Sequence, residues 1–178
     1  RVSEEFEQNL TDFIGLLFLL QRYEKEGLLK VFEEILKIKK ETLLLIIEKL
    51  LQENLIISTK NLYLVENDKL GRESLEALIH KLDLRQVYGI FTEQKDKVII
   101  LKQLARIATD EAITFLKELS KDLRKEIRQD VVNDIIHEKL ELLSVFAGRV
   151  PDVALITAKE IIECKKPLPA KKIHVKGW

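Results

Sequence analysis

The sequence predicts a mainly α-helical protein that carries one small β-hairpin. Three observations support this fold class. Apolar residues recur at helical spacing through most of the 178 residues. A single pair of short β-prone runs flanks a polar turn. Apolar residues make up 46% of the chain and charged residues 34%, which is the composition of a globular protein rather than a disordered one.

The first 65 residues predict three helices and then the hairpin. Residues 4–23 and 28–37 carry apolar positions at the spacing of amphipathic helices. A third helix is expected from Thr42 to about Glu53, with Thr42 or a neighbouring residue as its cap. The β-prone runs "LIIS" and "LYLV" then flank the turn "TKN". They predict a hairpin within residues 55–65, which we expect to be the only β structure of the chain.

The remainder of the chain is predicted to be helical. Helices are expected at 73–82 and 84–91, followed by a series of short amphipathic helices over 96–140 with breaks near Thr109 and Asp122. Pro151 is placed for the first turn of a last helix. The tail, residues 165–178, has five lysines, two prolines and no acidic residue, and we expect a solvated extension there.

Two stretches resemble known folds. The order helix, helix, turn, helix, hairpin over residues 13–66 resembles a winged helix-turn-helix domain. Residues 96–164 resemble HEAT repeats, with Ala105 and Ala108 before the turn and with Asp122 and Arg128 at inter-repeat positions. The resemblance implies a winged-helix-like domain at 1–70, linker helices at 71–95, HEAT-like repeats at 96–164 and the basic tail. Such repeats stack on neighbouring elements to bury their faces.

The third helix combines the layout of a DNA-reading helix with an apolar composition. If Leu43 faces the core, Leu45 points almost directly away from it, and Leu44 and Ile46 lie toward the margins. An exposed apolar stripe usually marks an interaction site. We therefore predict a partner interface at Leu44, Leu45 and Ile46, covered by the C-terminal helices, by a second copy of the chain or by another protein.

Basic residues offer nucleic acid few contacts. Residues 1–70 hold ten Lys and Arg against thirteen Asp and Glu, whereas a DNA-binding module carries a basic footprint. The candidate phosphate contacts are Lys37, Lys39, Lys40, Lys60, Lys171 and Lys172. Solvated loops and a solvated tail explain these lysines more simply. The tail lysines, beside Trp178, suit nucleic acid or an acidic surface.

The sequence shows no pattern of catalytic, cofactor-binding or metal-binding residues. Phosphate-binding glycine motifs are absent, and so are GxSxG, HExxH and CxxC. His137 and Glu141 lie four residues apart but have no further ligand at metal-site spacing, so a surface pair is the simpler interpretation.

Cys164 is the only cysteine, which suits a reducing compartment, and we expect core packing for it in a cytoplasmic protein. No apolar run is long enough to span a membrane. The scarcity of Cys and Met, with many charges, resembles thermophile composition.

Two functional hypotheses follow. The first is a non-enzymatic interaction or scaffold protein whose winged helix binds protein, through a partner or through self-association, and needs no cofactor. The alternative is a winged-helix transcriptional regulator that binds DNA as a dimer, in which a second copy covers the apolar face. Affinity for DNA that falls steeply with salt would distinguish the second from the first.

Overall fold

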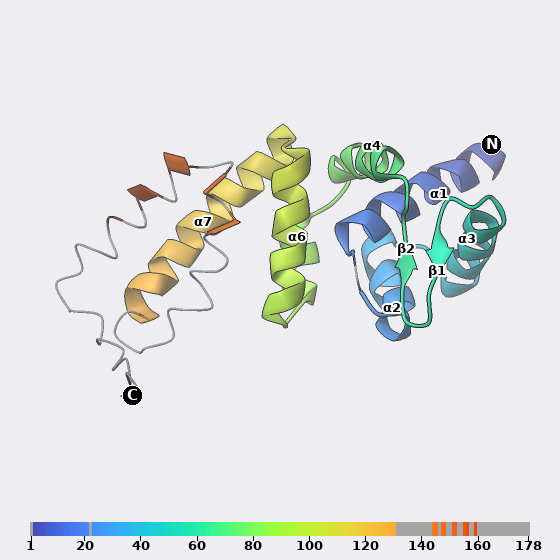
Figure 1. Ribbon diagram of the computed structural model, residues 1–178, viewed down its shortest axis with the longest axis horizontal. Coiled ribbons are helices and arrows are strands. Elements are labelled where there is room, and N and C mark those ends of the chain that lie inside the picture. The colour runs from blue at the N-terminus through green and yellow to red at the C-terminus, as the bar shows by residue number, and fades with distance from the viewer. Residues whose placement is uncertain are drawn as a thin grey trace, which may run out of the picture.

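A computed structural model of the chain describes residues 2–21, 23–130, 144–145, 147–148, 151–152, 155–156 and 159. In these residues the helices are α1 (Val2–Leu19), α2 (Lys25–Leu36), α3 (Lys40–Gln52), α4 (Asp68–Ile79), α5 (Leu84–Ile90), α6 (Gln94–Ile107) and α7 (Asp110–Asp130), and the strands are β1 (Ile57–Ser58) and β2 (Tyr63–Leu64). The predicted fold class, mainly α with one small hairpin, is confirmed. Figure 1 shows α1, α2, α3 and the hairpin at one end of the molecule and α6 and α7 toward the other.

The hairpin forms where the β-prone runs predict it. Strands β1 and β2 pair antiparallel, with Ile57 opposite Leu64 and Ser58 opposite Tyr63. Lys25, at the start of α2, fixes the hairpin to the helices. Its ammonium donates to Ser58 Oγ over 2.7 Å and lies 4.4 Å from the centre of the Tyr63 ring.

Helices α1 and α4 approach each other closely because both carry a glycine at their contact. A Cβ atom on Gly15 would lie 2.6 Å from the carbonyl oxygen of Ser74 in α4. A Cβ atom on Gly71 would lie 2.2 Å from the ring of Phe18 in α1. Leu75 and Leu78 of α4 are buried in the resulting contact. The two glycines thus set the distance between the helices, because any larger side chain would separate them.

The predicted break near Thr109 is confirmed, and the one near Asp122 is wrong. Ala108 ends α6 in the left-handed conformation, with φ 54°, and Thr109 Oγ1 accepts a hydrogen bond from the Ala112 N–H at the start of α7. Helix α7 continues through Asp122 to Asp130. The stretch "KELSKDLRKEIR" contains no Gly or Pro and is rich in Lys, Glu, Leu and Arg, which favour the helix throughout.

The start of α3 also differs from the prediction. The helix begins at Lys40, two residues before Thr42, and its N-cap is Lys39, which makes no side-chain capping hydrogen bond. Thr42 therefore lies inside the helix and does not cap it. Side-chain caps occur instead at α4, where Asn67 accepts from the Leu70 N–H, and at α5, where Asp83 accepts from two backbone N–H groups.

One continuous hydrophobic core connects the described helices, and α1 lies at its centre. Residues 13–19 of α1 are all buried, and α1 contacts α2, α3, α4 and α6. The Phe13 and Phe32 rings pack edge to face with their centres 4.7 Å apart. Val145, beyond α7, also packs against this core. Among the described helices, none is long and apolar enough to cross a membrane.

Within residues 96–123, most but not all of the apolar positions that suggested HEAT repeats are buried in the core, and the resemblance to that family stays a prediction. Leu104 and Leu116 are completely buried, and Ile113 is half-buried. The side chains of Ile127 and Arg128 lie outside the described residues, so the inter-repeat role of Arg128 stays a prediction. Arg85 of α5 lies within 3.4 Å of Asp122.

Candidate protein-interaction surface

A three-residue turn, residues 37–39, separates α2 from α3 and sets the direction of α3. Lys37 adopts the left-handed conformation at φ 59°, and its N–H donates to the Glu33 carbonyl over 3.1 Å, which closes the end of α2. Lys39 then takes an extended conformation and α3 begins. The turn places α3 so that one of its faces packs against the core and the other faces solvent.

The buried face of α3 consists of Leu43, Ile46, Ile47 and Leu50, each at most 5% exposed. The opposite face carries Leu44, 48% exposed, and Leu45, 59% exposed. The prediction that Leu45 points outward is therefore confirmed, and the described residues of the chain leave it uncovered. The prediction for Ile46 is wrong, because this side chain is 0% exposed. Ile46 lies about 60° around the helix axis from Leu43, and the core is wide enough to cover this flank of α3 as well.

Charged residues surround the two exposed leucines. Glu41 lies one turn before them and Glu48 one turn after them, and both are exposed. The Gln52 amide donates to Glu48 over 3.3 Å, and the Lys49 ammonium lies 2.6 Å from a carboxylate oxygen of Glu53. The outward face of α3 is thus a small apolar centre between two carboxylates, and we name Glu41, Leu44, Leu45 and Glu48 the α3 face.

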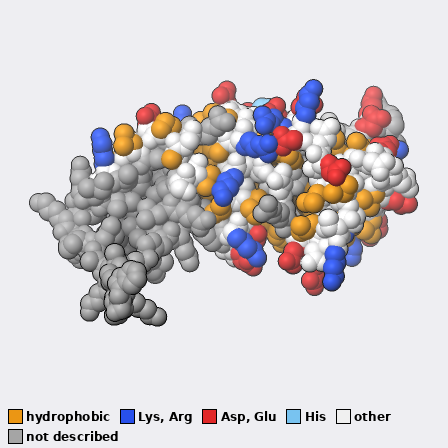
Figure 2. Space-filling model, viewed as in Figure 1, with side chains coloured by type: hydrophobic (Ala, Val, Ile, Leu, Met, Phe, Trp, Pro, Cys, Tyr) orange, Lys and Arg blue, Asp and Glu red, His pale blue; other side chains and the backbone are white. Residues whose placement is uncertain are grey.

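Among the candidate phosphate-binding lysines that the structure describes, Lys40 lies one turn from Leu44 on α3, and the others lie in the turn and the hairpin. Lys37, Lys39 and Lys40 are exposed around the turn before α3, and Lys60 is exposed at the tip of the hairpin. Lys171 and Lys172 lie outside the described residues. On the side of the molecule drawn in Figure 2, Lys, Arg, Asp and Glu are interspersed, with apolar side chains between them and no continuous basic stripe.

A separate acidic hollow lies where the start of α2 approaches the start of α6. It encloses about 330 Å³ and is lined by Tyr23, Glu24, Glu26, Gly27, Glu93, Lys95 and Asp96. Desolvation, followed by repulsion from Glu93 and Glu24, raises the pKa of Asp96, although Lys95 opposes this shift. Desolvation and neighbouring carboxylates likewise raise the pKa of the Tyr23 phenol. In the described part of the chain, no three His, Cys, Asp or Glu residues are placed to hold a metal ion.

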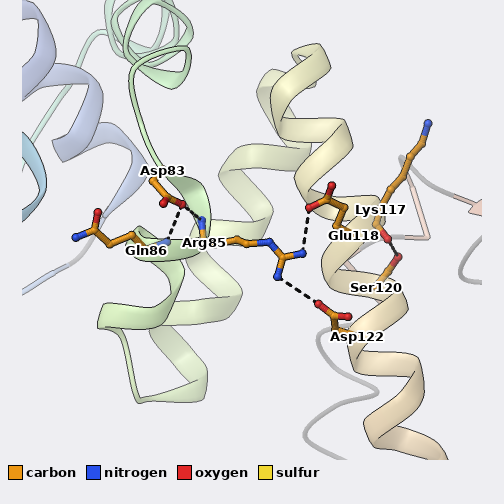
Figure 3. A network of polar contacts seen from close by, with 7 residues as sticks. All are labelled: Asp83, Arg85, Gln86, Lys117, Glu118, Ser120 and Asp122. Carbon is orange, nitrogen blue, oxygen red and sulfur yellow. Dashed lines mark hydrogen bonds and ion pairs between the residues drawn. The ribbon is translucent and has the colours of Figure 1, made fainter.

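A second hollow separates the segment before α5 from the first turns of α7. Arg85 projects from α5 across it, as Figure 3 shows, and its guanidinium lies 3.0 Å from Glu118 and 3.4 Å from Asp122. These hydrogen bonds raise the pKa of Arg85. Sequence spacing could not reveal either hollow, because each joins residues from separate segments. The capping pattern at Asp83, an acid directly before an apolar helix, was the only local signal.

Leu44 and Leu45 of the predicted interface are exposed and Ile46 is buried, and the binding of a partner at this surface stays a prediction. The structure leaves His137, Glu141 and Cys164 outside the described residues. Comparisons with protein-family models, with curated proteins and with solved structures find no match to this chain.

Proposed function

We propose that this protein is a non-enzymatic, cytoplasmic interaction module that docks another protein on its α3 face. The exposure of Leu44 and Leu45 is the observation that supports this function. Both lie in a regular helix whose other side is anchored in the core, so the apolar surface is held in a fixed position. Rigid apolar side chains surrounded by polar residues are typical centres of protein interfaces.

The charges around the leucines favour a partner of different sequence over a second copy. In an antiparallel pairing of two α3 helices centred between Leu44 and Leu45, Glu41 of one copy would face Glu48 of the other. Like charges at that distance repel. Lys40 and Lys49 also flank the leucines, so the matching surface carries apolar side chains with complementary charges of both signs at its rim. A complete interface buries about 800 Å² on each partner, so the leucines form its centre and neighbouring residues its rim.

A winged helix-turn-helix provides the frame for this proposal, with the HEAT-like helices as its support. The α2, turn, α3 and hairpin order fits such a frame. The second candidate function is DNA binding by a dimer of this chain, which the exposed Lys37, Lys39, Lys40 and Lys60 favour. Against it, Leu45 and Glu48 take the outward positions where a base-reading helix has Arg, Lys, Asn or Gln.

The experiment compares Leu45→Arg with the matched control Leu155→Arg. Leu155 is 57% exposed, close to the 59% of Leu45, but lies far from α3 in the sequence. A photo-crosslinking residue introduced at position 45, and separately at 155, captures neighbouring proteins in cells, and each captured protein is then purified and titrated. We expect a protein that crosslinks at 45 alone and that loses affinity in Leu45→Arg by about tenfold to hundredfold, the equivalent of one buried leucine. Leu155→Arg should bind it as the wild type does.

Two results would contradict the proposal. One is a captured partner whose affinity is unchanged in Leu45→Arg. The other is tight binding of duplex DNA that weakens steeply between about 50 and 200 mM salt, as counterion release requires. Sedimentation velocity over a range of concentrations tests self-association. A dimer lost in Leu45→Arg would assign the α3 face to a second copy instead.

A further inference from the structure

An open groove of about 480 Å³ runs between residues 82–85 and the first turns of α7. Its lining residues are Leu82, Asp83, Leu84, Arg85, Asp110, Glu111, Thr114, Phe115 and Glu118. Leu84 and Phe115 are nearly buried and form an apolar floor. The remaining residues are mostly exposed and form a polar rim. We name this feature the α5–α7 groove.

The rim of the α5–α7 groove is acidic. The lining includes four carboxylates, from Asp83, Asp110, Glu111 and Glu118, and one guanidinium, from Arg85. Arg85 reaches two carboxylates of α7, as Figure 3 shows, and one of these, Asp122, adds a further negative charge beyond the lining. The imidazole of His80 lies 2.7 Å from Glu111. At neutral pH the groove therefore carries an excess of negative charge over an apolar floor.

The tail of the same chain has the complementary chemistry. Residues 165–178 contain five lysines and no acidic residue, together with Leu168, Ile173, Val175 and Trp178. Alternating lysines and apolar residues suit a groove that has an acidic rim and an apolar floor. The acidic hollow beside α2 matches the tail less well, because five of its seven lining residues are charged and it has no aliphatic floor.

The tail is also tethered within reach of the groove. Val145 packs against the core, and Lys165 follows it by twenty residues. A segment of that length spans at most about 66 Å when fully extended, and less here because residues 151–152, 155–156 and 159 are helical. Tethering raises the effective concentration of the tail near the groove to the order of millimolar. A weak electrostatic contact, which would not form between separate molecules at low concentration, is then populated within one chain.

From this groove and this tail we infer an intramolecular contact: residues 165–178 bind in the α5–α7 groove, with lysines at the carboxylate rim and apolar side chains on the floor. The tail would leave the groove when a more basic partner binds there or when salt screens the charges. It does not depend on the proposed function of the α3 face, and the two are tested by different variants.

Trp178 is the only tryptophan in the chain, so its fluorescence reports on the tail in the full-length protein. The test variant is Asp110→Asn combined with Thr114→Lys, which makes the groove more positive by two charges. Both residues are exposed, and the new side chains are compatible with a helix. The control is Glu26→Lys, which makes the same change of charge in the acidic hollow. Circular dichroism and thermal unfolding check that all three proteins are folded.

The measurement is acrylamide quenching of Trp178 at about 50 mM and about 1 M NaCl, where the screening length falls from over 10 Å to about 3 Å. We expect the quenching constant of the wild type to be at least about twofold higher at high salt than at low salt. In the groove variant, the quenching constant at low salt should already equal the high-salt value of the wild type. Glu26→Lys should behave as the wild type does. The inference is overturned if wild-type quenching does not respond to salt, if Glu26→Lys releases the tryptophan equally, or if protection disappears on dilution, which would place the contact between two copies.

Discussion

Three consecutive residues of α3 have different environments, and the difference follows from their rotation around the helix axis. Leu44 and Leu45 face solvent, whereas Ile46, the next residue, is completely buried. Successive residues are about 100° apart, so one step is enough to move a side chain from the surface to the core. Helical rotation placed Leu44 and Ile46 at opposite margins of the outward face, and a single helix does not show how far the core extends toward each margin, which is why the predicted interface included Ile46.

Alanine substitutions distinguish these residues by stability. We expect Ile46→Ala to lower the free energy of unfolding by about 2–5 kcal/mol, because it leaves a cavity in the core. Leu45→Ala should change it by no more than about 0.5 kcal/mol, because the side chain is already exposed in the monomer. Urea unfolding followed by circular dichroism measures both. Equal losses would show that Leu45 is covered within the chain.

At the scale of elements, the contact between α1 and α4 depends on the absence of a side chain. Gly15 faces the backbone of Ser74 and Leu75, and this backbone cannot move aside as a flexible side chain would. The same helices bury large side chains on either side of the contact, among them Phe18 and Leu78. A glycine in a helix normally lowers stability, and here the close packing offsets that loss.

Gly15→Ala is therefore expected to destabilise the protein, although alanine is the better helix former. Overpacking costs about 1–3 kcal/mol and exceeds the gain in helix propensity of about 1 kcal/mol. Gly89→Ala in α5 is the matched control, since nothing lies within 4 Å of the added Cβ. It should raise the free energy of unfolding by about 0.5–1 kcal/mol. Thermal unfolding of the two variants would contradict this account if both changed in the same direction.

The approach of α2 to α6 makes stability depend on pH through Asp96. Its pKa is raised in the folded state, mainly by desolvation, so the folded protein binds this proton more readily than the unfolded chain. Charged Asp96 therefore lowers the stability of the folded protein. This loss is complete above the raised pKa and disappears as the pH falls to the pKa of Asp96 in the unfolded chain. We expect Asp96→Asn to stabilise the protein at pH 7 and to lose this advantage near pH 4. Urea unfolding at both pH values measures the difference, and a variant less stable than the wild type at pH 7 would contradict it.

At the scale of the whole molecule, α1 connects the two ends of the described structure. Its buried face contacts α2 and α3 on one side and α4 and α6 on the other. Phe18 touches Gly71 of α4, and the Arg106 guanidinium of α6 lies 5.9 Å from the centre of its ring. A core shared in this way should unfold cooperatively, since neither end keeps its apolar surface buried without α1.

Phe18→Ala tests this cooperativity. The loss of a buried ring should cost about 3–5 kcal/mol and lower protection throughout the core, not only near the substitution. Hydrogen exchange measured by mass spectrometry would show faster exchange in α3 and in α6 together. If α6 and α7 kept their wild-type protection while α1 to α3 lost theirs, the chain would consist of two independent folding units.

The local sequence determined which segments form helices, where the hairpin lies and where α6 ends, because helical periodicity, β-prone runs and capping residues act over a few residues. It also determined that Leu45 points outward, since that requires only one helix and one inward reference position. Tertiary structure decided what local signals do not contain. The width of the core around α3 buried Ile46, and the α1–α4 contact gave Gly15 its role. The α5–α7 groove exists only because residues 82–85 and 110–118 meet in space. Side chains acquire these environments from neighbours distant in the sequence, and a single helix does not specify those neighbours.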